Sequence, residues 1–260
     1  MEAKITDEEL IRGLKNIYST KYEKMFSSEK PFVLTFAGAP GSGKSSIASI
    51  FSYFLDIPIL INDEARSEVG KMGYNREGME AKKLRELMPD VAYRSSSSFI
   101  LDYNCQFSTH FLRKKCEQFG YGYYIVELEN DKATLIERIK NRANNASDDV
   151  NFSKAGLDNL QLYYHRMETE WDEKEYKENC GNALKCFSLE ADSVEDIIER
   201  IKEISEEIRE LTPIENKNSR SLKEVEDVIV AVVTQKEKQV FDARNIVRTS
   251  GSNPNEEIDI

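Results

Sequence analysis

The chain has 260 residues, of which 40% are hydrophobic and 32% are charged, a composition typical of a soluble globular protein. Its formal net charge of −11 disfavours long nucleic acids and anionic membranes as main partners, although a local basic cleft is still compatible with it. No apolar run approaches the roughly 18 residues of a membrane span. The polar, acidic start MEAKITDEEL also lacks the pattern of a signal or transit peptide. We therefore expect a cytoplasmic protein.

Few cysteines and histidines are available for chemistry. The histidines, His110 and His165, are too few to supply a zinc site or a Ser-His-Asp triad well, so we expect surface or packing roles for them. No cysteine pair has C-x-x-C spacing, and without a signal peptide all of them are expected to be reduced, unpaired thiols. The cysteines are Cys105, Cys116, Cys180 and Cys186.

Strand-like and helix-like segments alternate along the chain. An amphipathic helix is predicted over 6–26, with Thr6 and Glu9 in a capping box. Short apolar runs predict strands at 31–37, 58–62, 98–103, 122–129 and 183–190. Helical spacing predicts helices near 45–55, 63–71, 76–88, 108–119, 131–143 and 194–211. This alternation predicts an α/β fold: a doubly wound, five-stranded parallel sheet with helices on both faces.

An insertion interrupts the alternation between the fourth and fifth strands. Residues 144–152 are loop-like, and a charged, aromatic helix is expected at about 153–178. A mobile lid is expected there, over about 143–178. We accordingly divide the chain into an N-terminal helical segment (1–30), a P-loop domain (31–211) and a C-terminal appendage (212–260).

The appendage differs in character from the rest of the chain. Residues 212–221 are expected to be a linker, because they combine proline with many polar side chains. The segments 227–234 and 240–248 could form a β-hairpin, and a helix over 221–245 is the competing prediction. The polar tail 249–260 is expected to be disordered.

One motif specifies the chemistry of the P-loop domain. The run from Gly38 to Ser45, GAPGSGKS, satisfies G-x-x-x-x-G-K-[ST] between a predicted buried strand and a helix. Its glycines let backbone N–H groups surround phosphates, and the helix N-terminus adds a positive dipole end. Lys44 is expected to reach the β- and γ-phosphates, and the Ser45 hydroxyl to bind Mg²⁺. The predicted nucleotide-binding residues are Gly38, Gly41, Ser42, Gly43, Lys44, Ser45 and Ser46.

Charged residues at the ends of two predicted strands are candidates for the rest of the site. Asp102 ends the run SFILD, where an aspartate can hold Mg²⁺ directly or through water, or simply cap the next turn. Asp63 and Arg66 share one helical face after the second strand. Asp63 could accept a proton from an attacking hydroxyl, and Arg66 could bind an anionic group of the acceptor. The alternative is an N-cap and an exposed arginine.

Basic residues flank the predicted lid. Arg138 and Arg142 lie four positions apart on one helical face just before it. Arginines there could stabilise the charge of a transferring phosphoryl group, or merely complement a helix C-terminus. Arg166, in the following helix, is a further candidate.

Taken in order, these segments resemble a known family. The runs GAPGSGKS, NDEAR, FILDYN, GYGYYIVELE and ERIKNR are similar to the polynucleotide-kinase and zeta-toxin branch of P-loop kinases. The resemblance covers about residues 31–175. It implies that Asp63 is the general base, Arg66 the clamp for an acceptor phosphate, and Asp102 the strand-three aspartate. It further implies that Arg138 and Arg142 contact donor phosphates.

The resemblance has limits on the acceptor side. Asn104, a candidate acceptor contact, follows Tyr103, whereas polynucleotide kinases often have threonine between the aspartate and the asparagine. The opening helix resembles zeta-toxin-like proteins, whose acceptor is a nucleotide sugar, while the compact D-x-x-R element is closer to polynucleotide kinases. No D-x-D-x-[TV] phosphatase motif follows the kinase region.

The predicted function is transfer of the γ-phosphoryl group of ATP, with Mg²⁺, to a hydroxyl of a nucleotide-like or small-molecule acceptor. One alternative is a 5′-hydroxyl polynucleotide kinase. A second is a nucleotide-dependent ATPase or switch without a dedicated acceptor. A third is a binding module whose C-terminal appendage docks a protein partner.

Overall fold

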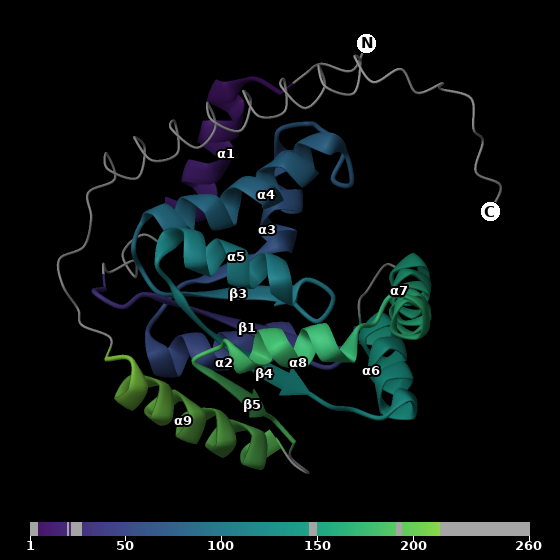
Figure 1. Ribbon diagram of the computed structural model, residues 1–260. Coiled ribbons are helices and arrows are strands. Elements are labelled where there is room, and N and C mark those ends of the chain that lie inside the picture. Colours follow the sequence, from purple (N-terminus) through teal and green to yellow (C-terminus); the bar gives the residue numbers. More distant parts are fainter. Residues whose placement is uncertain (1–4, 20, 22–27, 146–149, 191–193, 214–260) are drawn as a thin grey trace, which may run out of the picture.

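The computed structural model describes residues 5–19, 21, 28–145, 150–190 and 194–213, without the side chains of 142–155 (Figure 1). Over this part of the chain the fold is a five-stranded parallel sheet in the order β2-β3-β1-β4-β5, which confirms the predicted fold class. The strands are β1 (Phe32–Gly38), β2 (Ile59–Ile61), β3 (Phe99–Asn104), β4 (Gly122–Leu128) and β5 (Lys185–Ser188).

Helices cover both faces of the sheet (Figure 1). One face packs against α2 and α9, and the other against α1, α3, α4, α5 and α8. The remaining pair, α6 and α7, stands at the carboxyl ends of the strands. The helices are α1 (Asp7–Ser19), α2 (Lys44–Leu55), α3 (Asn62–Lys71), α4 (Met79–Arg94), α5 (Thr109–Phe119), α6 (Lys132–Asn145), α7 (Val150–Thr169), α8 (Glu173–Gly181) and α9 (Val194–Leu211).

The central strand β1 is buried along its whole length, between β3 and β4. Leu34 and Phe36 point into the core beneath α2 and α9, whereas Val33 and Ala37 point into the opposite core. A strand covered on both faces requires apolar side chains at successive positions, which explains the unbroken apolar run in the sequence. This burial fixes the position of the loop that follows β1.

Helix α1 docks onto the rest of the fold through its apolar stripe and one hydrogen bond. The Tyr18 hydroxyl, fully buried, donates to the Met88 carbonyl oxygen at 2.6 Å. At the other end, the predicted capping box is confirmed: the Glu9 amide donates to Thr6 Oγ1 at 3.2 Å, and the Thr6 amide donates to Glu9 Oε2 at 2.9 Å. In the structure, α1 ends at Ser19, before the predicted end at residue 26. Positions 20 and 22–27 lie outside the described residues.

The largest differences from the predicted helices after α1 are a break at Asp172 and a longer α4. The single helix expected at 153–178 is two helices, because Asp172 has extended backbone geometry and accepts a hydrogen bond from the Glu175 amide at 2.9 Å, starting α8 anew. Helix α4 continues past the predicted end at 88 and through Pro89. Burial of the turn that follows, including Val91 and Tyr93, offsets the hydrogen bond that proline removes.

The predicted linker beyond residue 213, the hairpin or helix, and the tail lie outside the described residues. In the part of the chain that the structure describes, no helix combines the length and hydrophobicity that a transmembrane span requires.

Candidate active site

The P-loop connects the buried end of β1 to the first turn of α2. Gly38, Gly41 and Gly43 all have positive φ angles, of 154°, 86° and 94°, which side-chain-bearing residues rarely adopt. A Cβ atom on Gly38 would also lie 2.9 Å from the carbonyl oxygen of Leu128 on β4. The loop therefore turns sharply beside the end of β4, and α2 begins at Lys44 with its N-terminus at the same edge of the sheet.

Lys44 folds back over the loop. Its Nζ atom donates hydrogen bonds to the carbonyl oxygens of Gly38 at 3.0 Å and Ala39 at 2.8 Å, and lies 3.3 Å from Ser42 Oγ. Burial lowers the pKa of Lys44 to about 8, and the negative charge of Asp102 acts in the opposite direction. The ammonium group is thus held among the atoms that would surround a bound phosphate.

Ser45 and Asp102 lie side by side at the start of α2 and the end of β3. Their side chains are hydrogen bonded, with the hydroxyl donating to the carboxylate. Burial raises the pKa of Asp102, while the Ser45 hydrogen bond and the nearby Lys44 ammonium lower it. A hydroxyl and a carboxylate are the hard oxygen ligands that Mg²⁺ accepts alongside phosphate and water, so the donor set fits this ion. Ser46, in the first turn of α2, is exposed.

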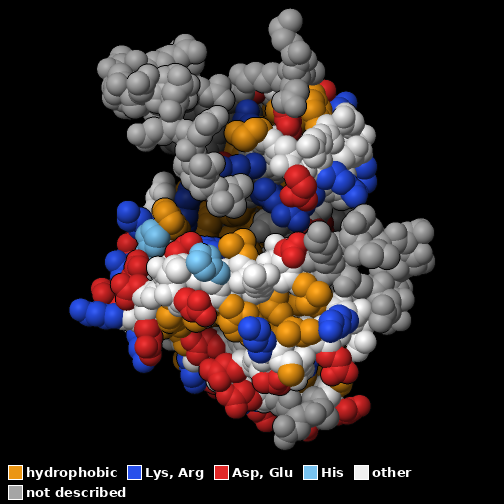
Figure 2. Space-filling view, turned by 90° about the vertical axis from the view of Figure 1, so that its right-hand side faces the viewer, with side chains coloured by type: hydrophobic (Ala, Val, Ile, Leu, Met, Phe, Trp, Pro, Cys, Tyr) orange, Lys and Arg blue, Asp and Glu red, His pale blue; other side chains and the backbone are white. Residues whose placement is uncertain are grey.

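A cavity of about 620 Å³ brings the strand ends, the P-loop and α7 together. On one wall are Lys44, Ser45, Asp63, Arg66, Asp102 and Asn104; on the other, α7 contributes Asn159, Leu162, Tyr163 and Arg166. Figure 2 shows the face of the molecule at the carboxyl ends of the strands, with Lys and Arg side chains gathered around its central hollow. The predicted residues from three separate segments thus line one space.

Asp63 and Arg66 form an ion pair at the mouth of this cavity. Arg66 Nη1 donates to Asp63 Oδ1 at 3.1 Å, and Arg66 Nε lies 3.5 Å from Glu77 Oε1. The Asp63 side chain is 79% exposed, and its charge raises the pKa of Asp102. The i, i+3 relationship expected from the sequence is confirmed, with both residues on the first turns of α3.

Asn104 contacts the P-loop itself. Its Oδ1 atom accepts hydrogen bonds from the Gly38 amide at 3.3 Å and from the Gln106 amide at 3.1 Å. Asn104 also lines the cavity. The side chain therefore fixes the start of the P-loop relative to the end of β3, which sequence spacing alone does not reveal.

The arginines near the lid have different surroundings. Arg138 Nη1 on α6 donates to Asn130 Oδ1 at 2.6 Å, and Arg138 is not among the residues lining the 620 Å³ cavity. Arg142 is also in α6, but its side chain lies outside the described part of the structure. Arg166 lines the cavity, with Cζ 4.2 Å from the centre of the Phe107 ring and Nε 2.6 Å from Glu170 Oε2.

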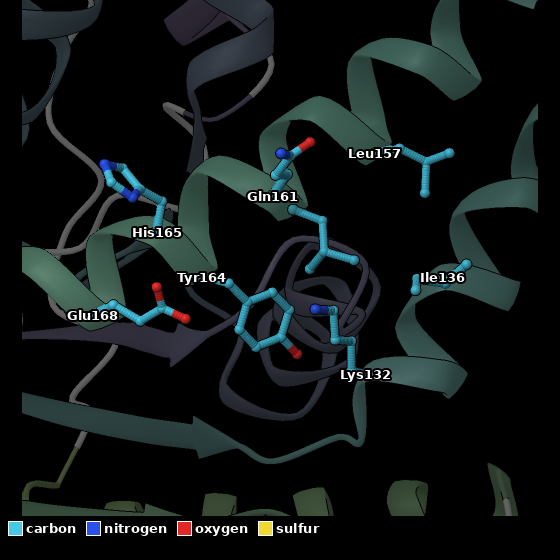
Figure 3. A pocket seen from close by; sticks show the side chains of 8 residues that line it. Lys132, Ile136, Leu157, Gln161, Tyr164, His165 and Glu168 are labelled. Atoms are coloured by element: carbon cyan, nitrogen blue, oxygen red, sulfur yellow. The ribbon is translucent and has the colours of Figure 1, made fainter.

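The two helices α6 and α7 pack together through a small apolar core. Figure 3 shows Lys132 and Ile136 of α6 facing Leu157 and Tyr164 of α7 across a pocket of about 430 Å³. The Lys132 ammonium lies 4.7 Å from the centre of the Tyr164 ring, a cation–π contact. This packing joins α7 to α6.

Sequence reasoning missed how α7 reaches the core. The Tyr163 hydroxyl donates to Gln106 Oε1 at 2.8 Å, and the Tyr163 and Phe107 rings meet edge to face with centroids 5.7 Å apart. The aromatic richness of the predicted lid helix was the available signal, but it did not identify a partner. The contact closes one side of the cavity.

Comparisons with known proteins give weak likenesses. Neither the models of known protein families nor the curated proteins contain a match to this chain. Similar solved structures include a protein of the PezAT chromosomal toxin–antitoxin system of Streptococcus pneumoniae, with 18% identity, a TM-score of 0.44, and coverage of 80% of this chain and 97% of that one.

Two further solved structures are similar. Shikimate kinase from Acinetobacter baumannii, in complex with shikimate, has 16% identity and a TM-score of 0.39, covering 71% of this chain and 93% of that one. Kti12 from Chaetomium thermophilum, in complex with ADP-AlF3, has 14% identity and a TM-score of 0.43, covering 70% of this chain and 100% of that one.

Proposed function

We propose that this protein is a phosphotransferase that moves the γ-phosphoryl group of ATP to a hydroxyl of a nucleotide-like or small-molecule acceptor. The observation that carries the proposal is the shared cavity, which Lys44 and Ser45 of the P-loop line together with the Asp63–Arg66 pair. A phosphate-binding loop and a carboxylate that line one cavity are the parts that phosphoryl transfer to a hydroxyl requires.

The donor side is formed by the P-loop and the start of α2. Backbone amides from Gly41 to Ser46 and the N-terminus of α2 would bind the phosphates, with Ser42 and Gly43 at the turn. Lys44 would exchange its contacts with the Gly38 and Ala39 carbonyls for the β- and γ-phosphates, a charge-assisted interaction.

Ser45 and Asp102 would hold Mg²⁺, directly or through water. When bound, Mg²⁺ supplies positive charge that neutralises the phosphate oxygens. The hydrogen bond between Ser45 and Asp102 keeps both oxygens on the same side of the P-loop before any ion arrives. Neither residue needs a large movement to take this role.

Asp63 would orient the acceptor hydroxyl and accept its proton, because it is exposed to the cavity and near the donor side. Arg66 would bind an anionic group of the acceptor, exchanging part of its pairing with Asp63 and Glu77. Asn104 would contact the acceptor while holding the P-loop. We keep Arg138 and Arg142 as candidates for donor phosphates; Arg138 would first have to leave Asn130.

Helix α7 would act as the lid. It forms one wall of the cavity, and its closure would exclude water, which otherwise competes with the acceptor hydroxyl. Because the cavity has walls on both sides, a compact acceptor is favoured. The alternative acceptor is longer: the 5′-hydroxyl end of a polynucleotide. The cytoplasm is the expected compartment, since ATP is the donor.

The test is Asp63→Asn, assayed with radiolabelled ATP against 5′-hydroxyl oligonucleotides, nucleosides and nucleotide sugars. We expect acceptor phosphorylation to fall by at least about a hundredfold, because general-base catalysis contributes that much, while nucleotide binding persists. Asp56→Asn, at the exposed end of α2, is the matched control. If no acceptor class is labelled and Asp63→Asn leaves ATP turnover unchanged, the ATPase or switch function is favoured instead.

A further inference from the structure

Two cysteines meet beside the P-loop, although they are not spaced as a recognised motif. Cys180 is in the last turn of α8, and Cys186 is in β5, after a turn closed by the Ala183 amide bonding to the Cys180 carbonyl oxygen at 3.0 Å. Cys186 Sγ donates to the Cys180 carbonyl oxygen at 3.7 Å, and each thiol is the largest influence on the pKa of the other. The fold thus brings two free thiols into direct contact.

Both thiols can be reached by small molecules. They are half-buried and line a second cavity of about 720 Å³, which also touches Gly38 and Ser42 of the P-loop. In contrast, Cys105 and Cys116 are 0% and 1% exposed, and burial raises the pKa of both thiols. Reaction of a thiol requires access to the reagent, so the half-buried Cys180 and Cys186 are open to oxidants from which Cys105 and Cys116 are shielded.

We propose that Cys180 and Cys186 are a redox modification site, at which a peroxide-class oxidant forms a reversible intramolecular disulfide. This inference concerns residues outside the proposed phosphotransfer machinery and does not depend on it.

The surroundings assign different parts to the two sulfurs. The neighbouring Cys186 thiol lowers the pKa of Cys180, whereas the contact with Cys180 and burial raise the pKa of Cys186. The Cys180 thiolate attacks a peroxide oxygen: an S–O bond forms, the O–O bond breaks, and hydroxide leaves to become water. Cys186, as thiolate, then attacks the Cys180 sulfur, so that the S–S bond forms and hydroxide leaves from sulfur.

The two thiols lose two protons and two electrons together, and hydrogen peroxide is reduced to two molecules of water. A dithiol reductant reverses the reaction by exchange.

The bond would tie α8 to the sheet. Tyr176 lies one turn before Cys180 and donates to Glu127 Oε1 on β4 at 2.7 Å, so α8 already rests on this cavity at one point. A covalent link at its last turn adds a second, permanent attachment. We expect slower amide hydrogen exchange over 173–188 in the oxidised protein, because the disulfide would allow α8 to open only together with β5.

The experiment uses the full chain, treated with stoichiometric hydrogen peroxide, then denatured, alkylated and digested for mass spectrometry. We expect a peptide pair linked through Cys180 and Cys186, with the mass of two hydrogen atoms lost, and only Cys105 and Cys116 alkylated. Dithiothreitol should restore four alkylated cysteines. Alkylation of all four after peroxide, a link to Cys105, or a link between two chains would overturn the proposal.

Two single variants test the order of events. Cys186→Ser should leave a sulfenic acid on Cys180 that a dimedone-type probe labels, because the resolving thiol is missing. Cys180→Ser should give no such label at Cys186, and both variants should keep the melting temperature of the parent to show that they fold. Equal labelling of the two sulfurs would contradict the assigned roles.

Discussion

The hydroxyl of Tyr163 on α7 donates a 2.8 Å hydrogen bond to Oε1 of Gln106, which follows β3 and is 57 positions earlier in the chain. This bond joins α7 to the segment that follows β3, and Gln106 Nε2 also lies 3.5 Å from the sulfur of Met167, one turn further along α7. A single polar side chain next to the P-loop thus anchors the helix that covers it.

Tyr163→Phe removes this anchor but keeps the ring against Phe107. We expect kcat/KM for phosphorylation of the acceptor to fall about fivefold, since one such hydrogen bond contributes roughly 1 kcal/mol. ATP hydrolysis without acceptor should rise, because a looser lid admits water. Steady-state kinetics measure both. Tyr164→Phe, whose ring contacts Lys132, is the matched control; an equal effect there would show that the bond to Gln106 is unimportant.

Nucleotide affinity should depend on the protonation of Lys44. Burial lowers its pKa to about 8, so the ammonium form that binds phosphate dominates below that pH and is lost above it. We expect the association constant of Mg-nucleotide to be level below pH 8. Above it, the constant should fall by up to about tenfold per pH unit until the raised pKa of the complex is reached.

Titration calorimetry across this range measures the dependence. Lys44→Arg is the control, because a guanidinium stays charged throughout. A level profile for the parent protein, or the same decline in Lys44→Arg, would rule out Lys44 as the titrating group.

The Ser45–Asp102 pair should set the magnesium requirement. Asp102→Asn removes the carboxylate charge, and we expect the Mg²⁺ concentration for half-maximal nucleotide binding to rise at least about tenfold. Ser45→Ala should act in the same direction, whereas Ser49→Ala, one turn further along the exposed side of α2, should have no effect. Nucleotide binding measured without Mg²⁺ should not weaken in Asp102→Asn; if it does, the residue acts on the nucleotide by another route.

The two described lid arginines should differ in importance. Arg166 lines the cavity and lies over Phe107, so Arg166→Ala should lower acceptor kcat/KM by about tenfold or more, the value of one charge-assisted contact. Arg138 bonds to Asn130 outside that cavity, and Arg138→Ala should cost about threefold or less. Melting curves check that α7 stays folded. A larger loss in Arg138→Ala than in Arg166→Ala would instead favour a donor-phosphate role for Arg138.

The sequence predicted most of the architecture because its signals are local. The buried run before GAPGSGKS, the helical spacing after it, and the capping box at Thr6 and Glu9 each depend on residues within one element. The same holds for the Asp63–Arg66 pair, which one helical turn brings together. The break at Asp172 and the continuation through Pro89 were missed, because capping and tertiary burial there outweigh periodicity.

Hydrophobic periodicity and backbone geometry act over a few residues, so the parallel sheet, the P-loop motif and the short-range pairs can be predicted from the sequence alone. Other side chains come together only through tertiary packing: Asp102 with Ser45, Tyr163 with Gln106, and Cys180 with Cys186. These pairs come from elements that the parallel sheet and its covering helices bring together at one edge. Their contact therefore depends on packing across the fold, which no local pattern encodes.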